Sequence, residues 1–158
     1  MSETNKPAEQ NPAEETSGAY DALLLKNQLC FPLYAVSKEV VRLYKPFLDE
    51  IGLTYTQYIA MMVLWEKRSL TVKELGEYLY LDSGTLTPLL KKMEAQGLVS
   101  RQRNAADERS VIVSVTAQGE ALRARAATIP ERLGACLPLS KGEADTLYQL
   151  LYKVLHAI

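Results

Sequence analysis

The chain has 158 residues, of which 47% are hydrophobic and 23% charged, and its formal net charge is −1. This length predicts one domain with a substantial core over residues 20–158, and the lack of an apolar run of about 18 residues excludes a membrane span. Residues 1–19 are polar and rich in Pro and Glu, so we expect a disordered tail and no signal peptide on a cytoplasmic protein. The near-neutral charge does not by itself indicate a nucleic-acid partner.

An apolar-periodic segment from Tyr20 to about Tyr44 predicts a long first helix. Pro32 falls inside this segment and cannot donate a helical backbone hydrogen bond, so we expect a kink beside Cys30. The apolar positions that define the periodicity are Leu24, Leu29, Leu33, Val36, Val40 and Leu43.

Three further helices are predicted by the residues that would begin and end them. Thr54 with Gln57, and Thr71 with Glu74, match the capping-box pattern, in which a hydroxyl and a side chain three residues later satisfy each other's backbone N–H groups. The second of these helices should end near Leu79 or Tyr80. A third helix should then follow directly.

Asp82 is a suitable N-cap for this third helix, and Gly97 should stop it in the left-handed conformation. Pro88 lies beyond the tolerated first position and removes one backbone hydrogen bond, so we expect a loose or bent start. The helix carries an apolar stripe at helical spacing, made of Leu86, Leu89, Leu90 and Met93.

Residues 98–103 and 110–116 predict the two strands of a hairpin, because apolar and polar residues alternate at period two in the second of them. The polar tip, residues 104–109, carries Asp107 and Arg109. Alone, such a tip is a loop of solvated charges. After a pair of short helices it is typical of a winged helix-turn-helix, which predicts a mainly α fold with a small β-hairpin wing and a DNA-binding part over residues 54–116.

The C-terminal part adds two amphipathic helices. Thr116 should cap a long Ala-rich helix, and Ser140 with Glu143 forms another capping box that opens the last helix. The apolar faces of these helices and of the first helix have no place in a small winged helix, and such faces are usually covered by a partner subunit. We therefore expect a symmetric homodimer built from residues 20–53 and 117–158.

The expected DNA contacts lie on the second helix of the pair and on the wing. Small hydroxyl side chains near the helix start suit base edges, and lysines a turn later suit phosphates. The wing arginine suits the minor groove, whose negative potential attracts guanidinium groups, with Asp107 holding Arg109 or the wing backbone in place. Alternatively, the hydroxyls only cap the helix and the lysines form a solvated face. The residues concerned are Ser83, Thr85, Thr87, Lys91, Lys92 and Arg109.

Cys30 and Cys136 lie 106 positions apart and match no zinc pattern, and the chain has a single histidine, so we expect no metal and no cofactor. A cysteine is by default a small buried hydrophobic residue. The surroundings of Cys30 suggest a reactive thiol instead, because several tyrosines follow it and phenol groups can stabilise a thiolate through hydrogen bonds.

Geometry limits which tyrosines can serve. Cys30 and Tyr34 share a helix face at i, i+4, whereas Tyr44 lies about 21 Å further along an unbroken helix. An antiparallel partner helix would bring Tyr44 and Tyr55 of one subunit to Cys30 of the other. The alternative is that these tyrosines are core residues with incidental neighbours.

Four segments of the chain, residues 27–31, 53–58, 79–91 and 107–111, resemble the MarR family of winged-helix regulators and, within it, the organic hydroperoxide resistance regulators. The third segment is long enough to be highly specific. The resemblance implies a homodimeric repressor that releases operator DNA when organic hydroperoxide, its inducer, oxidises an N-terminal cysteine. Pro32 departs from the family pattern.

The resemblance also assigns roles to individual residues. Cys30 matches the cysteine that reacts with peroxide, Tyr44 and Tyr55 match tyrosines that hydrogen-bond it across the dimer, and Tyr34 matches a third neighbouring tyrosine. The wing arginine of the family corresponds to Arg109.

Members of the family have one or two functional cysteines. Cys136 lies where the two-cysteine kind keeps the resolving cysteine that forms the intersubunit disulfide. Residues 133–138 around it form no strong motif.

Two other functions remain open at this point, and two more are disfavoured. The chain could be a MarR-type regulator that binds a small aromatic ligand and has an inert Cys30, or a regulator that uses Cys30 alone with external thiols. A thiol peroxidase has no support, because no general acid or base accompanies Cys30. A purely structural dimerisation module does not explain the wing.

Overall fold

The structure is a computed structural model that describes residues 20–157 except for the side chain of Glu108. The chain divides into two compact units, one up to Val40 and one from Val41 onward. The tail predicted to be disordered, residues 1–19, lies outside the described residues. Within residues 20–157, none of the helices has both the length and the apolar character required to cross a membrane.

The first unit begins with two short 3₁₀ helices, η1 (Asp21–Leu23) and η2 (Leu25–Asn27), and α2 (Cys30–Asp49) starts after them. The prediction of one helix from residue 20 is therefore wrong. Side-chain amides explain the interruption, since Asn27 Nδ2 donates to the Asp21 carbonyl at 2.7 Å and Gln28 Nε2 donates to the Ala22 carbonyl. Such bonds compete with the helical backbone pattern.

Pro32 does not kink the helix, contrary to the prediction. Cys30 is the first residue of α2, so Pro32 falls in the first turn, where backbone N–H groups have no helical partner. Pro46 is the proline inside the helix, which continues to Asp49.

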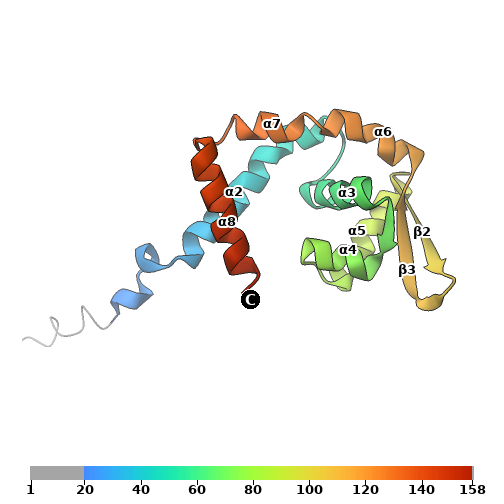
Figure 1. Ribbon diagram of the computed structural model, residues 1–158, viewed down its shortest axis with the longest axis horizontal. Coiled ribbons are helices and arrows are strands. Elements are labelled where there is room, and N and C mark those ends of the chain that lie inside the picture. The colour runs from blue at the N-terminus through green and yellow to red at the C-terminus, as the bar shows by residue number, and fades with distance from the viewer. Residues whose placement is uncertain (1–19, 158) are drawn as a thin grey trace, which may run out of the picture. The chain divides into compact units, whose positions relative to one another are not determined.

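The second unit contains the predicted helix pair (Figure 1). It holds α3 (Tyr55–Lys67), α4 (Val72–Leu79) and α5 (Ser83–Ala95), and the capping boxes that open α3 and α4 are confirmed. Asp82 caps α5 as predicted by accepting from the Thr85 N–H at 2.9 Å. Helix α5 runs without interruption through Pro88, and Gly97 adopts a φ of 73° after it, as expected of a helix stop.

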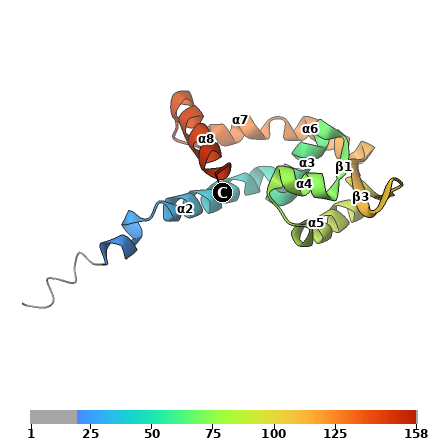
Figure 2. The same ribbon diagram turned by 60° about the horizontal axis from the view of Figure 1, so that its bottom comes forward.

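The sheet has three strands, not the two predicted. Strands β1 (Ser69–Thr71), β2 (Val99–Asn104) and β3 (Asp107–Val115) form an antiparallel sheet in the order β1-β3-β2. Val113 of the central strand β3 pairs with Leu70 of β1 on one side and with Arg101 of β2 on the other. Figure 2 shows β1 beside β3. A three-residue strand is too short to display a period-two pattern, which is why the sequence did not reveal it.

The hairpin is also longer than expected. Residues 104–109 were predicted as a polar tip, but the strands continue to Asn104 and from Asp107, which leaves a turn of two alanines. The pairing shifts register between Arg103 and Asn104. This irregularity places the residues around Arg109 in a distorted part of β3.

The predicted long Ala-rich helix is two helices, α6 (Ala117–Ala126) and α7 (Ile129–Gly134), which run end to end in Figures 1 and 2. Pro130 is the reason, because it cannot donate to the Ala126 carbonyl and its ring would clash there. Thr116 caps α6 as predicted, by accepting from the Gly119 N–H at 3.0 Å. The last helix, α8 (Lys141–Leu155), opens with the predicted Ser140 capping box.

The core of the second unit lies between α3, α4, α5 and the sheet, with α6 and α7 closing it. The Trp65 indole N–H donates to the Gly119 carbonyl at 3.0 Å in the buried interior. By contrast, no residue of α8 is buried. Its exposed apolar side chains are Leu147, Tyr148, Leu150, Leu151, Tyr152 and Val154.

Substitution of Gly119 tests this packing. A Cβ at Gly119 would overlap the Leu98 carbonyl oxygen and lie 3.0 Å from Val115 Cγ2. We expect Gly119→Ala to lower the free energy of unfolding by about 3 kcal/mol, the upper end for an overpacked site. Gly142→Ala is the matched control, since nothing lies within 4 Å of its Cβ position. Urea unfolding followed by circular dichroism measures both, and equal stabilities would contradict the packing described here.

Candidate functional site

The residues predicted to contact DNA from the helix all lie on α5 and are all exposed: Ser83, Thr85, Thr87, Lys91 and Lys92. Two of the hydroxyls also serve the helix itself. Thr85 Oγ1 donates to Asp82 Oδ2 at 2.9 Å, and Thr87 Oγ1 donates to the Ser83 carbonyl at 2.7 Å. Their oxygens can still accept a hydrogen bond from an external donor. Capping and contact roles are therefore compatible at these positions.

The Asp82 carboxylate is held in its charged form by the helix it caps. The Thr85 backbone N–H, followed by the Thr85 hydroxyl, lowers the pKa of Asp82 below its ordinary value. Asp82 therefore keeps its negative charge at the start of α5 at neutral pH. This charge fixes the backbone of the first turn, on which the exposed hydroxyls stand.

At the wing, Asp107 organises the backbone around Arg109. Asp107 Oδ1 accepts from the Arg109 N–H at 3.1 Å, and the Asp107 carbonyl accepts from the Ser110 hydroxyl at 3.0 Å. Asp107 was expected to hold either the Arg109 side chain or the wing backbone, and these hydrogen bonds are of the second kind. The Arg109 residue is exposed.

An ion pair between Glu94 and Arg101 connects α5 to the wing and was not predicted. Glu94 Oε2 accepts from Arg101 Nε at 3.0 Å and from Nη2 at 2.7 Å, while Oε1 accepts from the Arg101 backbone N–H at 2.9 Å. The hydrogen bonds from the Arg101 side chain are the main reason that the pKa of Glu94 is lowered. The two residues lie on elements of different type, so no periodic pattern in the sequence signals the pair.

Both cysteines are free and exposed, so the default of a buried hydrophobic residue is wrong for each. Cys30 is the first residue of α2 in the first unit, and Tyr34, which is 65% exposed, follows four residues later on the same helix. Cys136 lies in the second unit, between α7 and α8. Its thiol donates to the Arg132 carbonyl at 3.4 Å.

Tyr44 and Tyr55 are brought together in the second unit, with ring centroids 4.9 Å apart. Tyr58 joins them at 5.8 Å from Tyr44 and lies 6.4 Å from Trp65. Sequence analysis missed Tyr58 because an aromatic residue on the buried face of a helix looks like an ordinary core residue. The three tyrosines are called the phenol cluster below.

The environment of the phenol cluster keeps its hydroxyl groups protonated. Burial, followed by the neighbouring Tyr55 and Tyr58, raises the pKa of Tyr44 to about 12. Burial also raises the pKa of Tyr55 and of Tyr58. Tyrosine is already protonated at neutral pH, so the raised pKa values extend the range in which the three phenols stay O–H donors toward higher pH.

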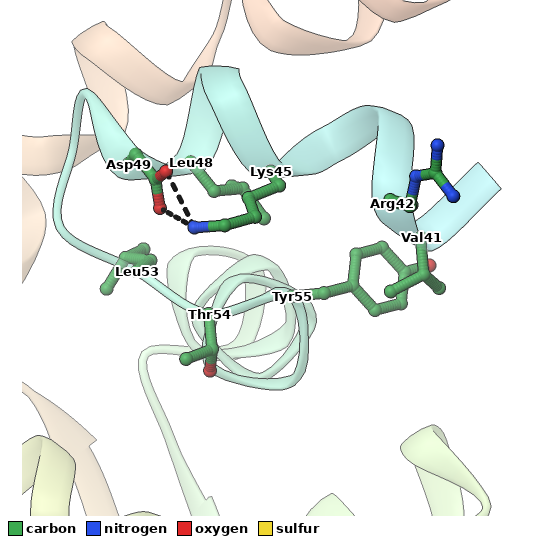
Figure 3. A pocket seen from close by; sticks show the side chains of 8 residues that line it. All are labelled: Val41, Arg42, Lys45, Leu48, Asp49, Leu53, Thr54 and Tyr55. Atoms are coloured by element: carbon green, nitrogen blue, oxygen red, sulfur yellow. Dashed lines mark hydrogen bonds and ion pairs between the residues drawn. The ribbon is translucent and has the colours of Figure 1, made fainter. Parts of the chain in front are cut away.

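A pocket of about 280 Å³ lies beside Tyr55, whose ring forms one wall (Figure 3). Apolar side chains of α2 and of the α2–α3 connection line it together with a polar rim, where Lys45 Nζ lies 2.8 Å from Asp49 Oδ2. The lining residues are Val41, Arg42, Lys45, Leu48, Asp49, Leu53, Thr54 and Tyr55. The pocket offers apolar surface next to a phenol group.

The end of α2 is attached to α7 by an arginine. Arg132 donates to the two oxygens of Glu50 at 2.8 and 2.7 Å, and its guanidinium lies 4.4 Å from the Phe47 ring centre. The hydrogen bond from Arg132 is the main reason that the pKa of Glu50 is lowered. Arg132 also supplies the carbonyl that accepts from Cys136, so this thiol borders the attachment.

Comparison with known proteins gives consistent results. Residues 42–125 match the family model described as transcriptional regulator SarA/Rot. The organic hydroperoxide resistance transcriptional regulator of Bacillus subtilis is 51% identical over 142 residues, which cover 88% of this chain and 95% of that protein. SarZ, a helix-turn-helix transcriptional regulator of Staphylococcus aureus, is 43% identical over 123 residues, which cover 78% of this chain and 83% of SarZ.

Among solved structures, reduced AbfR bound to DNA matches with a TM-score of 0.76 and 32% identity, covering 88% of this chain and 95% of that one. AbfR comes from Staphylococcus epidermidis. The fold of these similar proteins is a winged helix, and those with a functional name are transcriptional regulators and not enzymes.

The raised pKa of Tyr44 predicts a change in the pH dependence of stability. Between about pH 10, the ordinary value for tyrosine, and the native pKa of about 12, the unfolded chain loses the Tyr44 proton while the folded protein keeps it. The folded state then binds more protons, so the free energy of unfolding falls as the pH rises. We expect Tyr44→Phe to reduce this slope, measured by urea unfolding at a series of pH values. An unchanged slope would show that Tyr44 titrates normally.

Proposed function

The chain belongs to the SarA/Rot family of winged-helix transcriptional regulators, and on this basis we propose that it is a homodimeric repressor that releases operator DNA when an organic hydroperoxide oxidises Cys30. The observation that carries the proposal is the exposed Cys30 thiol in a chain that is 51% identical to an organic hydroperoxide resistance regulator. As a regulator of operator DNA, the protein acts in the cytoplasm.

The chemical step is a two-electron oxidation of sulfur. The Cys30 thiolate attacks the outer oxygen of the hydroperoxide, the O–O bond breaks and an S–O bond forms. The leaving alkoxide takes up a proton and departs as the alcohol, so thiol plus hydroperoxide give sulfenic acid plus alcohol. The exposed position of Cys30 at the start of α2 supports access by the peroxide.

The exposed apolar surface supports the homodimer. Helix α8 has no buried residue, and in the first unit Leu29 is 74% exposed and Phe31 42% exposed. Large apolar surfaces of this kind mark an interface in most proteins. In the proposed dimer, residues 20–53 and 117–158 cover one another's apolar faces.

The same dimer gives the phenol cluster a role. Tyr44 and Tyr55 of one subunit donate hydrogen bonds to the Cys30 thiolate of the other, while Tyr34 adds a phenol from the helix of Cys30 itself. The proximity of the two phenols supports this assignment, because the ring centroids of Tyr44 and Tyr55 lie 4.9 Å apart and both hydroxyl groups can donate to one acceptor. The apolar pocket beside Tyr55 suits the organic part of the peroxide.

Cys136 is proposed as the resolving residue. Its thiol condenses with the sulfenic acid of Cys30 in the other subunit, so that an S–S bond forms and water leaves. Its exposure supports this step. The disulfide-bonded form of AbfR, with a TM-score of 0.60 and 34% identity to this chain, shows that a relative forms a disulfide.

On DNA, the exposed hydroxyls of Ser83, Thr85 and Thr87 are proposed to face base edges in the major groove, and Lys91 and Lys92 to bind phosphates. Arg109 enters the minor groove, and Asp107 holds the wing backbone behind it. Two copies of α5 in a symmetric dimer would read the two halves of a palindromic site.

Substitution of the two cysteines tests the sensor. The probe is a DNA duplex selected from a random pool by the reduced wild-type protein, and binding is measured before and after cumene hydroperoxide. We expect reduced Cys30→Ser to bind the duplex as the wild type does. Cumene hydroperoxide should weaken its binding at least about tenfold less than it weakens binding of the wild type, a difference of about 1.4 kcal/mol. Retention of the full peroxide response in Cys30→Ser would refute the sensor role.

Cys136→Ser distinguishes the one-cysteine and two-cysteine mechanisms. Non-reducing gels of the oxidised wild type should show a covalent dimer that both serine variants lack. If Cys136→Ser keeps full release, an external thiol or the sulfenic acid itself is sufficient.

Removal of the wing arginine tests the DNA contact. Arg109→Ala should weaken duplex binding roughly tenfold, within the 1–3 kcal/mol typical of a groove contact. The slope of the logarithm of the binding constant against the logarithm of the salt concentration should become less steep by about one. Arg103→Ala is the matched control, since it removes the same charge from strand β2 of the same hairpin. Equal losses for the two variants would indicate a general charge effect and not a groove contact by Arg109.

A further inference from the structure

The Gln57 side chain is 1% exposed and is the one buried polar side chain among the described residues. A buried amide is costly unless its donor and acceptor groups find partners. Gln57 meets this requirement with two different helices. Its Oε1 accepts from the Thr54 N–H at 2.9 Å, and its Nε2 donates to Gln96 Oε1 at 2.9 Å. One rigid amide group therefore joins the start of α3 to a residue 39 positions later.

The α3 end of this link belongs to the phenol cluster. Thr54 is the N-cap of α3 and immediately precedes Tyr55, whose ring contacts Tyr44. A displacement of Tyr55 that includes its backbone shifts this first turn. The Thr54 N–H, to which Gln57 is bonded, moves with it.

The other end of the link belongs to α5, the helix proposed to read DNA and called the recognition helix below. Gln96 is the C-cap of α5, and its backbone N–H donates to the Lys92 carbonyl at 3.0 Å. The Gln96 carbonyl in turn accepts from Gln118 Nε2 at 3.0 Å. Side-chain amides thus hold the end of α5 from two sides, one from α3 and one from α6.

Packing leaves this end of α5 some freedom. A hollow of about 330 Å³ borders it, lined by Ile51, Gly52, Gln96, Leu98, Gln118 and Leu122. Because the hollow provides space on one side, a pull on Gln96 meets less resistance than it would in a close-packed core. The hydrogen bond from Gln57 can therefore reposition the helix end.

We propose that Gln57 is a positioning residue that transmits the oxidation state of the phenol-cluster site to α5. Displacement of Tyr55 on oxidation shifts the first turn of α3, Gln57 follows Thr54, and Gln96 is drawn or released with the end of the recognition helix. The inference rests on the function proposed above. It adds a specific route by which the sensor acts on the DNA-reading helix, through one hydrogen bond between two glutamines.

The test varies the acceptor and leaves Gln57 and its capping role intact. Gln96→Met removes the acceptor at similar side-chain size, whereas Gln96→Glu keeps an oxygen that can accept from Gln57 Nε2. Gln118→Met is the matched control, because it removes a hydrogen bond to the same helix end from the side of α6. The full chain is used, with the duplex selected by reduced wild-type protein. The measured quantity is the ratio of the dissociation constants after and before cumene hydroperoxide.

We expect Gln96→Met to reduce this ratio roughly threefold to tenfold, the range found for residues that carry coupling, while Gln96→Glu and Gln118→Met keep the wild-type ratio. A full ratio in Gln96→Met overturns the inference. So does an equal loss in Gln96→Met and Gln118→Met, since that result would reflect only a weakened helix end. If peroxide does not weaken DNA binding by the wild type, so that its ratio is one, the proposed function is refuted and the inference that rests on it is refuted as well. Mass spectrometry should show equal sulfenic acid formation at Cys30 in all variants, so that a difference in the ratio reflects coupling and not a difference in oxidation.

Discussion

Trp65 donates its indole N–H to the carbonyl of Gly119, and this buried hydrogen bond depends on the absence of a side chain at Gly119. The start of α6 can therefore lie against the Leu98 carbonyl at the base of the hairpin. Helix α3, the base of the wing and the start of α6 meet at this point, because α3 carries the donor, α6 carries the acceptor and Leu98 and Val115 border Gly119. This close approach therefore sets how α6 lies against α3 and the base of the wing.

The features that could be predicted from the sequence are those determined within a few residues. The capping boxes at Thr54, Thr71 and Ser140 each join a residue to another three positions later, and all three are present. The first helix was misjudged because the side-chain bonds of Asn27 and Gln28 to backbone carbonyls compete with an apolar period that also fits a helix. Pro130 could have been read as a helix break, since it is the second residue of α7 and interrupts the pattern visibly.

The site was predictable to a similar degree. The recognition-helix residues follow from the helix pattern, and the roles of the cysteines follow from the resemblance. Three participants were missed: Tyr58, the Glu94–Arg101 pair and the Gln57–Gln96 bond. Each of them joins elements that meet only after folding, and a glutamine that completes a capping box gives no sign of a second partner 39 positions away.

The three-bond ion pair between Glu94 and Arg101 has a consequence for how DNA sites are distinguished. Because it fastens the end of α5 to strand β2, a displacement of this helix end is shared by the wing. In the proposed complex with DNA, the offset between the bases that face α5 and the step that the wing reaches is then set by the protein. In the proposed dimer, a shift of the end of α5 therefore carries the wing with it and changes the spacing and tilt of the two half-site readers, so the length of the spacer between half-sites is the variable to which such a regulator responds.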